Sequence, residues 1–108
     1  MAPITHVVSF RFNPASSSAE RHLIASSFLA LQDQCIIDGN TYLSVTGGRS
    51  NSSEGFEKGF DHTYVVTFDT VEQRDYYVEK DPAHTKFKEL AKGHVVDLFV
   101  FDFEGGVF

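Results

Sequence analysis

The chain has 108 residues, eleven of them Phe, and a formal net charge of −6 at pH 7. This length predicts one domain, residues 1–108. Because the few Lys and Arg residues are scattered, the charge argues against nucleic acid or an anionic membrane as a partner. No apolar run is long enough to span a bilayer. A single cysteine excludes an internal disulfide, and the start of the chain lacks a signal-peptide pattern, so we expect a cytoplasmic protein.

The first segment with a clear period is residues 5–12, where apolar and polar side chains alternate as in a β-strand. One face of this strand would carry His6, Val8, Phe10 and Phe12. Ser17 and Glu20 have the spacing of a capping box, which predicts the start of a helix. Its apolar stripe would consist of Ile24, Phe28, Leu31 and Cys35. Residues 38–40, Asp-Gly-Asn, predict its end.

Two further strands are expected in the middle of the chain. Residues 41–46 form a weaker strand pattern that we expect Gly47 and Gly48 to end. Residues 49–59 are polar and contain glycine, which predicts an exposed loop. Residues 60–68 alternate again, and one face of this strand would carry His62, Tyr64, Val66 and Phe68.

Two helices are expected next. The first spans residues 71–79, and the second begins at Pro82, with Asp81 as its N-cap, and runs to Ala91. His84 then lies in the first turn of this second helix. Because the positive end of a helix disfavours an imidazolium ion, we expect a neutral His84 with one nitrogen free to accept a proton.

The last strand, residues 94–103, is apolar on both faces. Its alternation predicts that Val95, Phe99, Phe101 and Phe103 point one way and that Val96, Leu98 and Val100 point the other. The helices of one protomer can cover only one face of a sheet, so the other face needs a different cover. We expect a homodimer in which two sheets pack face to face. The alternatives are a monomer with an exposed apolar face, or a tail that folds over it.

The element order β-α-β-β-α-α-β predicts an α+β fold of the ferredoxin-like type, with a four-stranded antiparallel sheet and helices on one face. Three segments also resemble the stress-responsive A/B barrel (Dabb) family. Residues 5–12 resemble its opening strand, residues 59–68 its third strand, and residues 81–87 its Pro-Ala-His-x-x-Phe signature. The resemblance implies a homodimeric α/β barrel with a small-molecule pocket between sheet and helices in each protomer.

The resemblance also implies candidate site residues. A plant polyketide cyclase of this family closes a ring without a cofactor, and two of its catalytic histidines match His6 and His84. One of its pocket tyrosines matches Phe28, which implies a more apolar pocket here. Its second pocket tyrosine matches Val78, one residue beyond Tyr77. We expect His84 as the base, His6 as an orienting or polarising group, and Tyr77 or Tyr64 as the donor to an enolate. The expected ligand contacts are Phe28, Ile24, Leu31, His62 and Val8.

Three functions are consistent with these residues. The first is a cofactor-independent cyclase or lyase that acts on an apolar, aromatic or polyketide-like compound. The second is a non-catalytic stress-response protein whose stable dimer or bound ligand is its function. The third is a heme-free oxygenase, which ranks last because the chain has no Trp and no clear polar triad. We expect no cofactor. No pair of His, Cys or carboxylate residues has metal-ligand spacing, although a Mg²⁺ ion held by backbone carbonyls would leave no such pattern.

Overall fold

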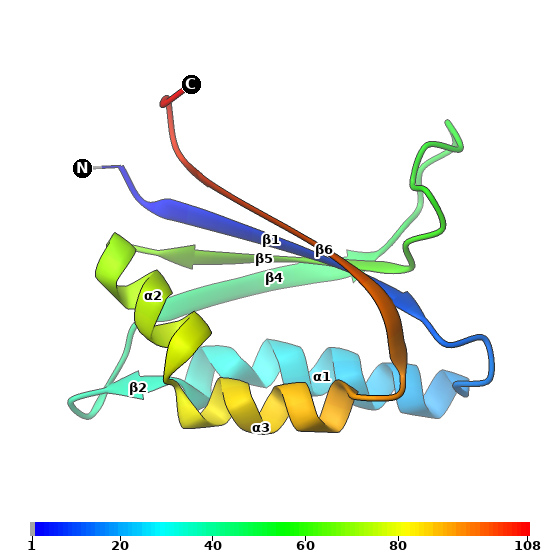
Figure 1. Ribbon diagram of the computed structural model, residues 1–108, viewed down its shortest axis with the longest axis horizontal. Helices are drawn as coiled ribbons and strands as arrows, with labels where there is room; N and C mark the ends of the chain where they lie inside the picture. Colours follow the sequence, from blue (N-terminus) through cyan, green and yellow to red (C-terminus); the bar gives the residue numbers. More distant parts are fainter. Residues whose placement is uncertain (1) are drawn as a thin grey trace.

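The computed structural model describes residues 2–108, and over this range it contains one four-stranded antiparallel sheet with three helices on one of its faces (Figure 1). The strand order is β4-β5-β1-β6. The elements of the main sheet are β1 (Ile4–Phe12), β4 (Leu43–Arg49), β5 (His62–Phe68) and β6 (Val95–Glu104), and the helices are α1 (Ser18–Gln34), α2 (Val71–Glu79) and α3 (Pro82–Ala91). This arrangement confirms the predicted α+β ferredoxin-like fold. None of the described helices has the length and apolar character needed to cross a membrane.

The core lies between the sheet and the helices. Every second residue of β1, from Ile4 to Phe12, is buried, as the alternation predicts. Pairing with both neighbours fixes which side chains meet: Val8 lies opposite Tyr64 on β5 and opposite Val100 on β6. The α1 helix contributes Ile24, Phe28 and Leu31 to this core. The pairing of β1 therefore fixes how its inward side chains align with those of β5 and β6.

The structure corrects two predicted element boundaries. The first helix ends at Gln34 rather than near residue 38, because Asp38 and Gly39 adopt positive φ angles of 51° and 80° and form the turn between β2 (Ile36–Ile37) and β3 (Asn40–Thr41). A tight hairpin turn favours this backbone and these residue types. In addition, β4 continues through Gly47 instead of ending there. A Cβ atom on Gly47 would lie 2.6 Å from the ring of Tyr64, so only glycine lets this strand lie so close.

The third correction concerns the faces of β6. The pairing of β6 with β1 shifts between Arg11 and Phe12, so Val95 pairs with Phe12. This irregularity, of the kind a β-bulge produces, places Val95 on the helix side with Leu98, rather than on the outer side with Phe99 as the simple alternation predicts. The outer face of β6 is bare: the side chains of Phe99, Phe101 and Phe103 are about half exposed.

Candidate functional site

A groove of about 810 Å³ opens on the helix side of the sheet, between β1 and β6 on one side and helices α2 and α3 on the other. Its wall is mostly apolar and includes Val8, Phe10, Phe28, Phe87, Leu98 and Val100. Its polar side chains include His6, Arg74, Tyr77, His84 and Asp102. A cavity of this size, with an apolar wall and a few convergent polar groups, suits a small organic molecule.

His6 enters the groove from the central strand. Its neighbour across the β1–β6 pair is Asp102, and the two side chains form a 2.6 Å contact between His6 Nδ1 and Asp102 Oδ1. A carboxylate can only accept, so Nδ1 carries a proton; Nε2 then has a lone pair in the neutral ring and an N–H group in the charged ring. The second oxygen of Asp102 accepts a hydrogen bond of 2.7 Å from Arg74 Nη1 on α2. The carboxylate is therefore held from both sides, and it orients the imidazole.

His84 enters the groove from the first turn of α3. Pro82 begins the helix, and the buried Asp81 carboxylate caps it by accepting from the backbone N–H groups of Ala83 and His84 at 2.9 and 3.4 Å. Asp81 also accepts a 2.5 Å hydrogen bond from the Tyr42 hydroxyl. These contacts position the His84 ring by fixing the helix start.

The protonation of His84 follows from its partner. Its Nδ1 lies 2.8 Å from the carbonyl oxygen of Tyr77. Because a carbonyl only accepts, Nδ1 carries the proton and Nε2 keeps a lone pair. Burial lowers the pKa of His84 to about 4, so the ring is neutral at pH 7. Our prediction attributed a neutral His84 to the helix end, whereas burial is the larger cause.

Tyr77 connects the two histidines. Its ring stacks on His84 with centroids 3.9 Å apart and meets the edge of His6 at 5.9 Å. The side chain is almost fully buried, and burial raises the pKa of its phenol. No other described residue forms a hydrogen bond with its hydroxyl. Of the two predicted tyrosines, Tyr77 is the one that lines the groove.

Four of the predicted site residues do not line the groove. Tyr64 lies behind Phe28, with the rings stacked at 4.0 Å, and its hydroxyl is 3.0 Å from His62 Nδ1. His62 lines a separate cavity at the other end of the sheet. Ile24 and Leu31 are fully buried in the core beneath α1. The expectation that all four face the ligand pocket is thus corrected, while Phe28 and Val8 do line the groove.

Two polar groups of the groove were not identified from the sequence. Asp102 follows Leu98 and Val100 on the inward face of β6, so the strand alternation could have predicted that it faces the groove. Arg74 lies on α2, where no pattern in the sequence distinguishes it from a solvent-facing residue. Across residues 2–108, no cluster of three or more His, Cys, Asp or Glu side chains has an arrangement that would hold a metal ion.

Comparison with known proteins adds a family and a set of structural neighbours. The family model of the stress responsive A/B barrel domain matches residues 4–105. The structure resembles a hydroxynitrile lyase from Passiflora edulis, with a TM-score of 0.84, 18% identity, and coverage of 99% of this chain and 97% of that chain. It also resembles a dimeric ferredoxin-like protein of unknown function from Thermobifida fusca, with a TM-score of 0.76, 16% identity, and coverage of 95% and 91%.

A third neighbour is SnoaB, a cofactor-independent oxygenase from Streptomyces nogalater, with a TM-score of 0.71, 10% identity, and coverage of 100% of this chain and 97% of that chain. No curated protein is similar enough in sequence to be matched with the chain. At these identities the neighbours establish the fold and leave the reaction to be argued from the groove.

Proposed function

The chain belongs to the stress responsive A/B barrel domain family, and from that premise we propose that its groove binds a small apolar carbonyl compound and removes a proton next to the carbonyl without a cofactor. The observation that carries this proposal is the convergence of His6 and His84 on one apolar groove, each with Nδ1 bound to an acceptor. A lyase and a cofactor-independent oxygenase among the neighbours give the fold a precedent for catalysis.

His84 is the base in this proposal. Its Nε2 has a lone pair and no proton, so it can only accept. A pKa of about 4 keeps this form fully populated at neutral pH, although it also makes the ring a weak base. The substrate C–H bond must therefore be acidified by polarisation of the neighbouring carbonyl. The bond breaks heterolytically, its electron pair forms an enolate, and the proton moves to His84 Nε2.

His6 and Tyr77 supply that polarisation. When His6 is protonated, Asp102 stabilises the imidazolium ion, and Nε2–H donates to the carbonyl oxygen as negative charge develops there. The Tyr77 hydroxyl is the second donor. The enolate carbon then attacks a second carbonyl of the same molecule and closes a ring, or the enolate forms a C=C bond as a β-substituent leaves with the electrons of its bond. The proton on His84 passes to the alkoxide or to the leaving group. An aromatic or polyketide-like compound satisfies both the apolar wall and the need for a carbonyl.

We also propose that the protein acts as a homodimer through the bare face of the sheet. The side chains of Phe99, Phe101 and Phe103 leave an apolar surface on this face, and soluble proteins seldom leave such a surface uncovered. A neighbour described as a dimeric ferredoxin-like protein supports this assembly. Because β6 carries this surface on one side and the groove wall on the other, dimer formation would hold the groove in shape.

Proton–deuterium exchange tests the chemistry without a known substrate. Acetophenone in D₂O serves as the probe, and the loss of its methyl protons is followed by ¹H NMR. We expect the protein to accelerate exchange over buffer, and His84→Ala to reduce the acceleration by roughly a hundredfold, the usual effect of a positioned base. His94→Ala is the matched control, because His94 does not line the groove and its polar side-chain contacts within residues 2–108 are with Ser16 and Glu20.

Two outcomes would contradict the proposal. One is no acceleration by the native protein at millimolar acetophenone, and the other is an undiminished rate in His84→Ala. If native protein broadens the acetophenone signals without exchanging its protons, the groove binds ligands but does not catalyse, which is the non-catalytic alternative.

A further inference from the structure

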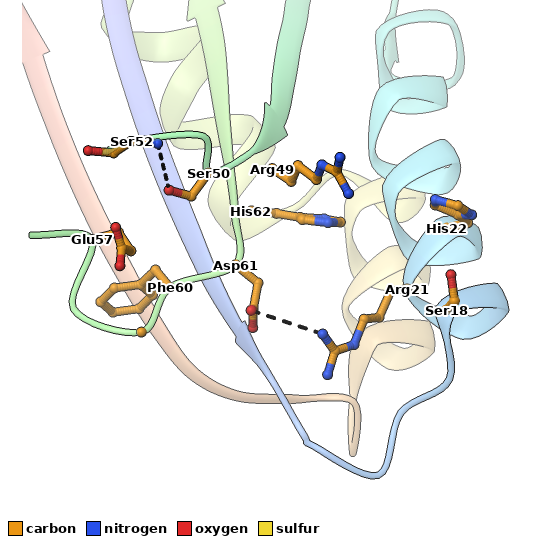
Figure 2. A pocket seen from close by; sticks show the side chains of 11 residues that line it. Ser18, Arg21, His22, Arg49, Ser50, Ser52, Glu57, Phe60, Asp61 and His62 are labelled. Carbon is orange, nitrogen blue, oxygen red and sulfur yellow. Dashed lines mark hydrogen bonds and ion pairs between the residues drawn. The ribbon is translucent and has the colours of Figure 1, made fainter. Parts of the chain in front are cut away.

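A second cavity, of about 580 Å³, lies on the same side of the sheet but at its other end, and it has no role in the proposed chemistry. We call it the cleft. Its walls are the first turns of α1, the facing ends of β4 and β5, and residues 50–61, which connect these strands (Figure 2). Its lining is largely polar and includes Ser18, Arg21, His22, Arg49, Asp61 and His62.

Basic side chains converge on the cleft from three elements. Arg49 and His62 are paired across β4 and β5, so their side chains lie side by side on one face. Both extend toward α1, where His22 and Ser18 face them (Figure 2). Arg21, one residue before His22, also reaches the cleft. The cleft thus brings two arginines and two histidines together, with Glu57 and Asp61 as its acidic groups.

The acidic groups of the cleft do not neutralise Arg49. Asp61 is already used, since its Oδ2 accepts a 2.8 Å hydrogen bond from the backbone of Phe12 and its Oδ1 lies 4.0 Å from Arg21. Glu57 lies on the far side of the connecting loop, near Phe60 (Figure 2). The guanidinium of Arg49 has no hydrogen bond or ion pair with any residue in the described part of the chain.

The partner of His62 gives this ring a donor in the cleft. The Tyr64 hydroxyl is buried, and His62 Nδ1 is its one neighbour within hydrogen-bond distance in the described range. A buried hydroxyl needs an acceptor, so Tyr64 donates to Nδ1. The ring proton of neutral His62 is then on Nε2. Burial lowers the pKa of His62; Asp61 opposes this shift, while Arg21, His22 and Arg49 add to it.

We propose that the cleft is an oxyanion site that binds the phosphate or carboxylate group of a small molecule between Arg49, His62 and His22. The Arg49 guanidinium supplies a planar pair of donors, which matches the oxygens of either group. Nε2–H of His62 and the Ser18 hydroxyl supply single donors beside it. The bound anion would also give Arg49 a counter-ion, which it lacks among the described residues. The polar cleft therefore selects charged ligands, and the apolar groove excludes them.

Titration of the native protein with inorganic phosphate and, separately, with succinate tests this proposal. The ring signals of His22 and His62 are followed by NMR at pH 6.5 and constant ionic strength. We expect saturable shifts at both rings and unchanged signals from His6 and His84 in the groove. The ligand with the tighter saturation identifies the favoured group, phosphate or carboxylate.

Three variants make the test specific. Arg49→Ala should weaken binding by roughly threefold to tenfold, since one partly solvated charge-assisted contact is lost. Lys86→Ala, which removes the same charge from an exposed position of α3 outside both cavities, should leave binding unchanged. Glu57→Gln should tighten it. The proposal is overturned if the shifts grow linearly without saturation with both ligands, or if Arg49→Ala and Lys86→Ala bind alike.

Discussion

The groove and the cleft both lie on the helix side of the sheet and both contain histidines, but the partner of each ring prepares it differently. In the groove, the Tyr77 carbonyl accepts from Nδ1 of His84, so this ring presents the Nε2 lone pair of a base, while the Asp102 carboxylate accepts from Nδ1 of His6 and supports the charged ring that donates from Nε2. In the cleft, a tyrosine hydroxyl donates to Nδ1 of His62, so this ring presents an N–H group. The atom behind the ring thus decides whether a histidine serves as a base or as an anion donor.

The surroundings reinforce this difference. His84 stacks on the Tyr77 ring, and its neutral form is favoured because burial penalises the charged one. The cleft is more polar and contains Arg21 and Arg49, which attract an anion. Both sites contain two histidines, yet the groove suits an apolar ligand and the cleft suits an anion.

The largest predicted effect is loss of the dimer, which should affect the groove and leave the cleft unchanged. Phe101→Asp places a charge on the bare face of β6, where an apolar interface would leave it unpaired at a cost of several kcal/mol. We expect sedimentation at micromolar concentration to give a mass of twice 12.1 kDa for the native protein and of 12.1 kDa, one chain, for the variant. Acetophenone exchange should weaken with it, since β6 is a groove wall, while phosphate binding in the cleft should persist. A native monomer would contradict the assembly.

The next effect tests how Asp102 acts on His6. Asp102→Asn replaces an acceptor-only group by one that can also donate, which allows the other His6 tautomer and removes the charge that stabilises the imidazolium. We expect the exchange rate to fall by about tenfold to a hundredfold, a typical effect for a group that supports a functional histidine. Asp97→Asn is the control, because Asp97 is exposed on the same strand and lies 4.0 Å from Arg11. Equal rates in the two variants would exclude this role.

Much of this architecture could be predicted because it depends on local periods. The alternation in residues 5–12 predicts the inward face of the central strand, and Asp81-Pro82 predicts the helix start that positions His84. Element order then predicts the ferredoxin-like sheet. These features need no knowledge of distant contacts, and the structure confirms them.

The remainder depends on contacts between distant segments. The faces of β6 depend on an irregular pairing with β1, and counting by twos from residue 94 assigns Val95 to the wrong side. Tyr64 and Tyr77 look equivalent in the sequence, yet stacking on Phe28 places Tyr64 outside the groove. The link from His6 through Asp102 to Arg74 joins two strands and a helix, so period alone does not show it.

The smallest predicted effect is the pH dependence of stability that His84 contributes. The pKa of His84 is about 4 in the folded protein and near 6.5 in the unfolded chain. Between these values the unfolded chain takes up a proton that the folded protein does not, so stability is highest above pH 6.5 and falls as the pH falls toward 4. With allowance for solvent screening we expect a loss of roughly 1–2 kcal/mol. Urea denaturation at pH 7 and pH 4.5, at fixed protein concentration, should show a smaller loss in His84→Gln, and equal losses would contradict this assignment.

The state of the His84 ring is the most direct test of the proposed groove chemistry. Nitrogen-15 shifts of the histidine rings report both the tautomer and the charge of each ring, and they need no substrate. We predict that His84 is neutral at pH 7 with its proton on Nδ1 and titrates near pH 4, while His62 in the same spectrum carries its proton on Nε2. A His84 ring that is protonated at pH 7, or that carries its proton on Nε2, would have no lone pair facing the groove and would contradict its role as the base.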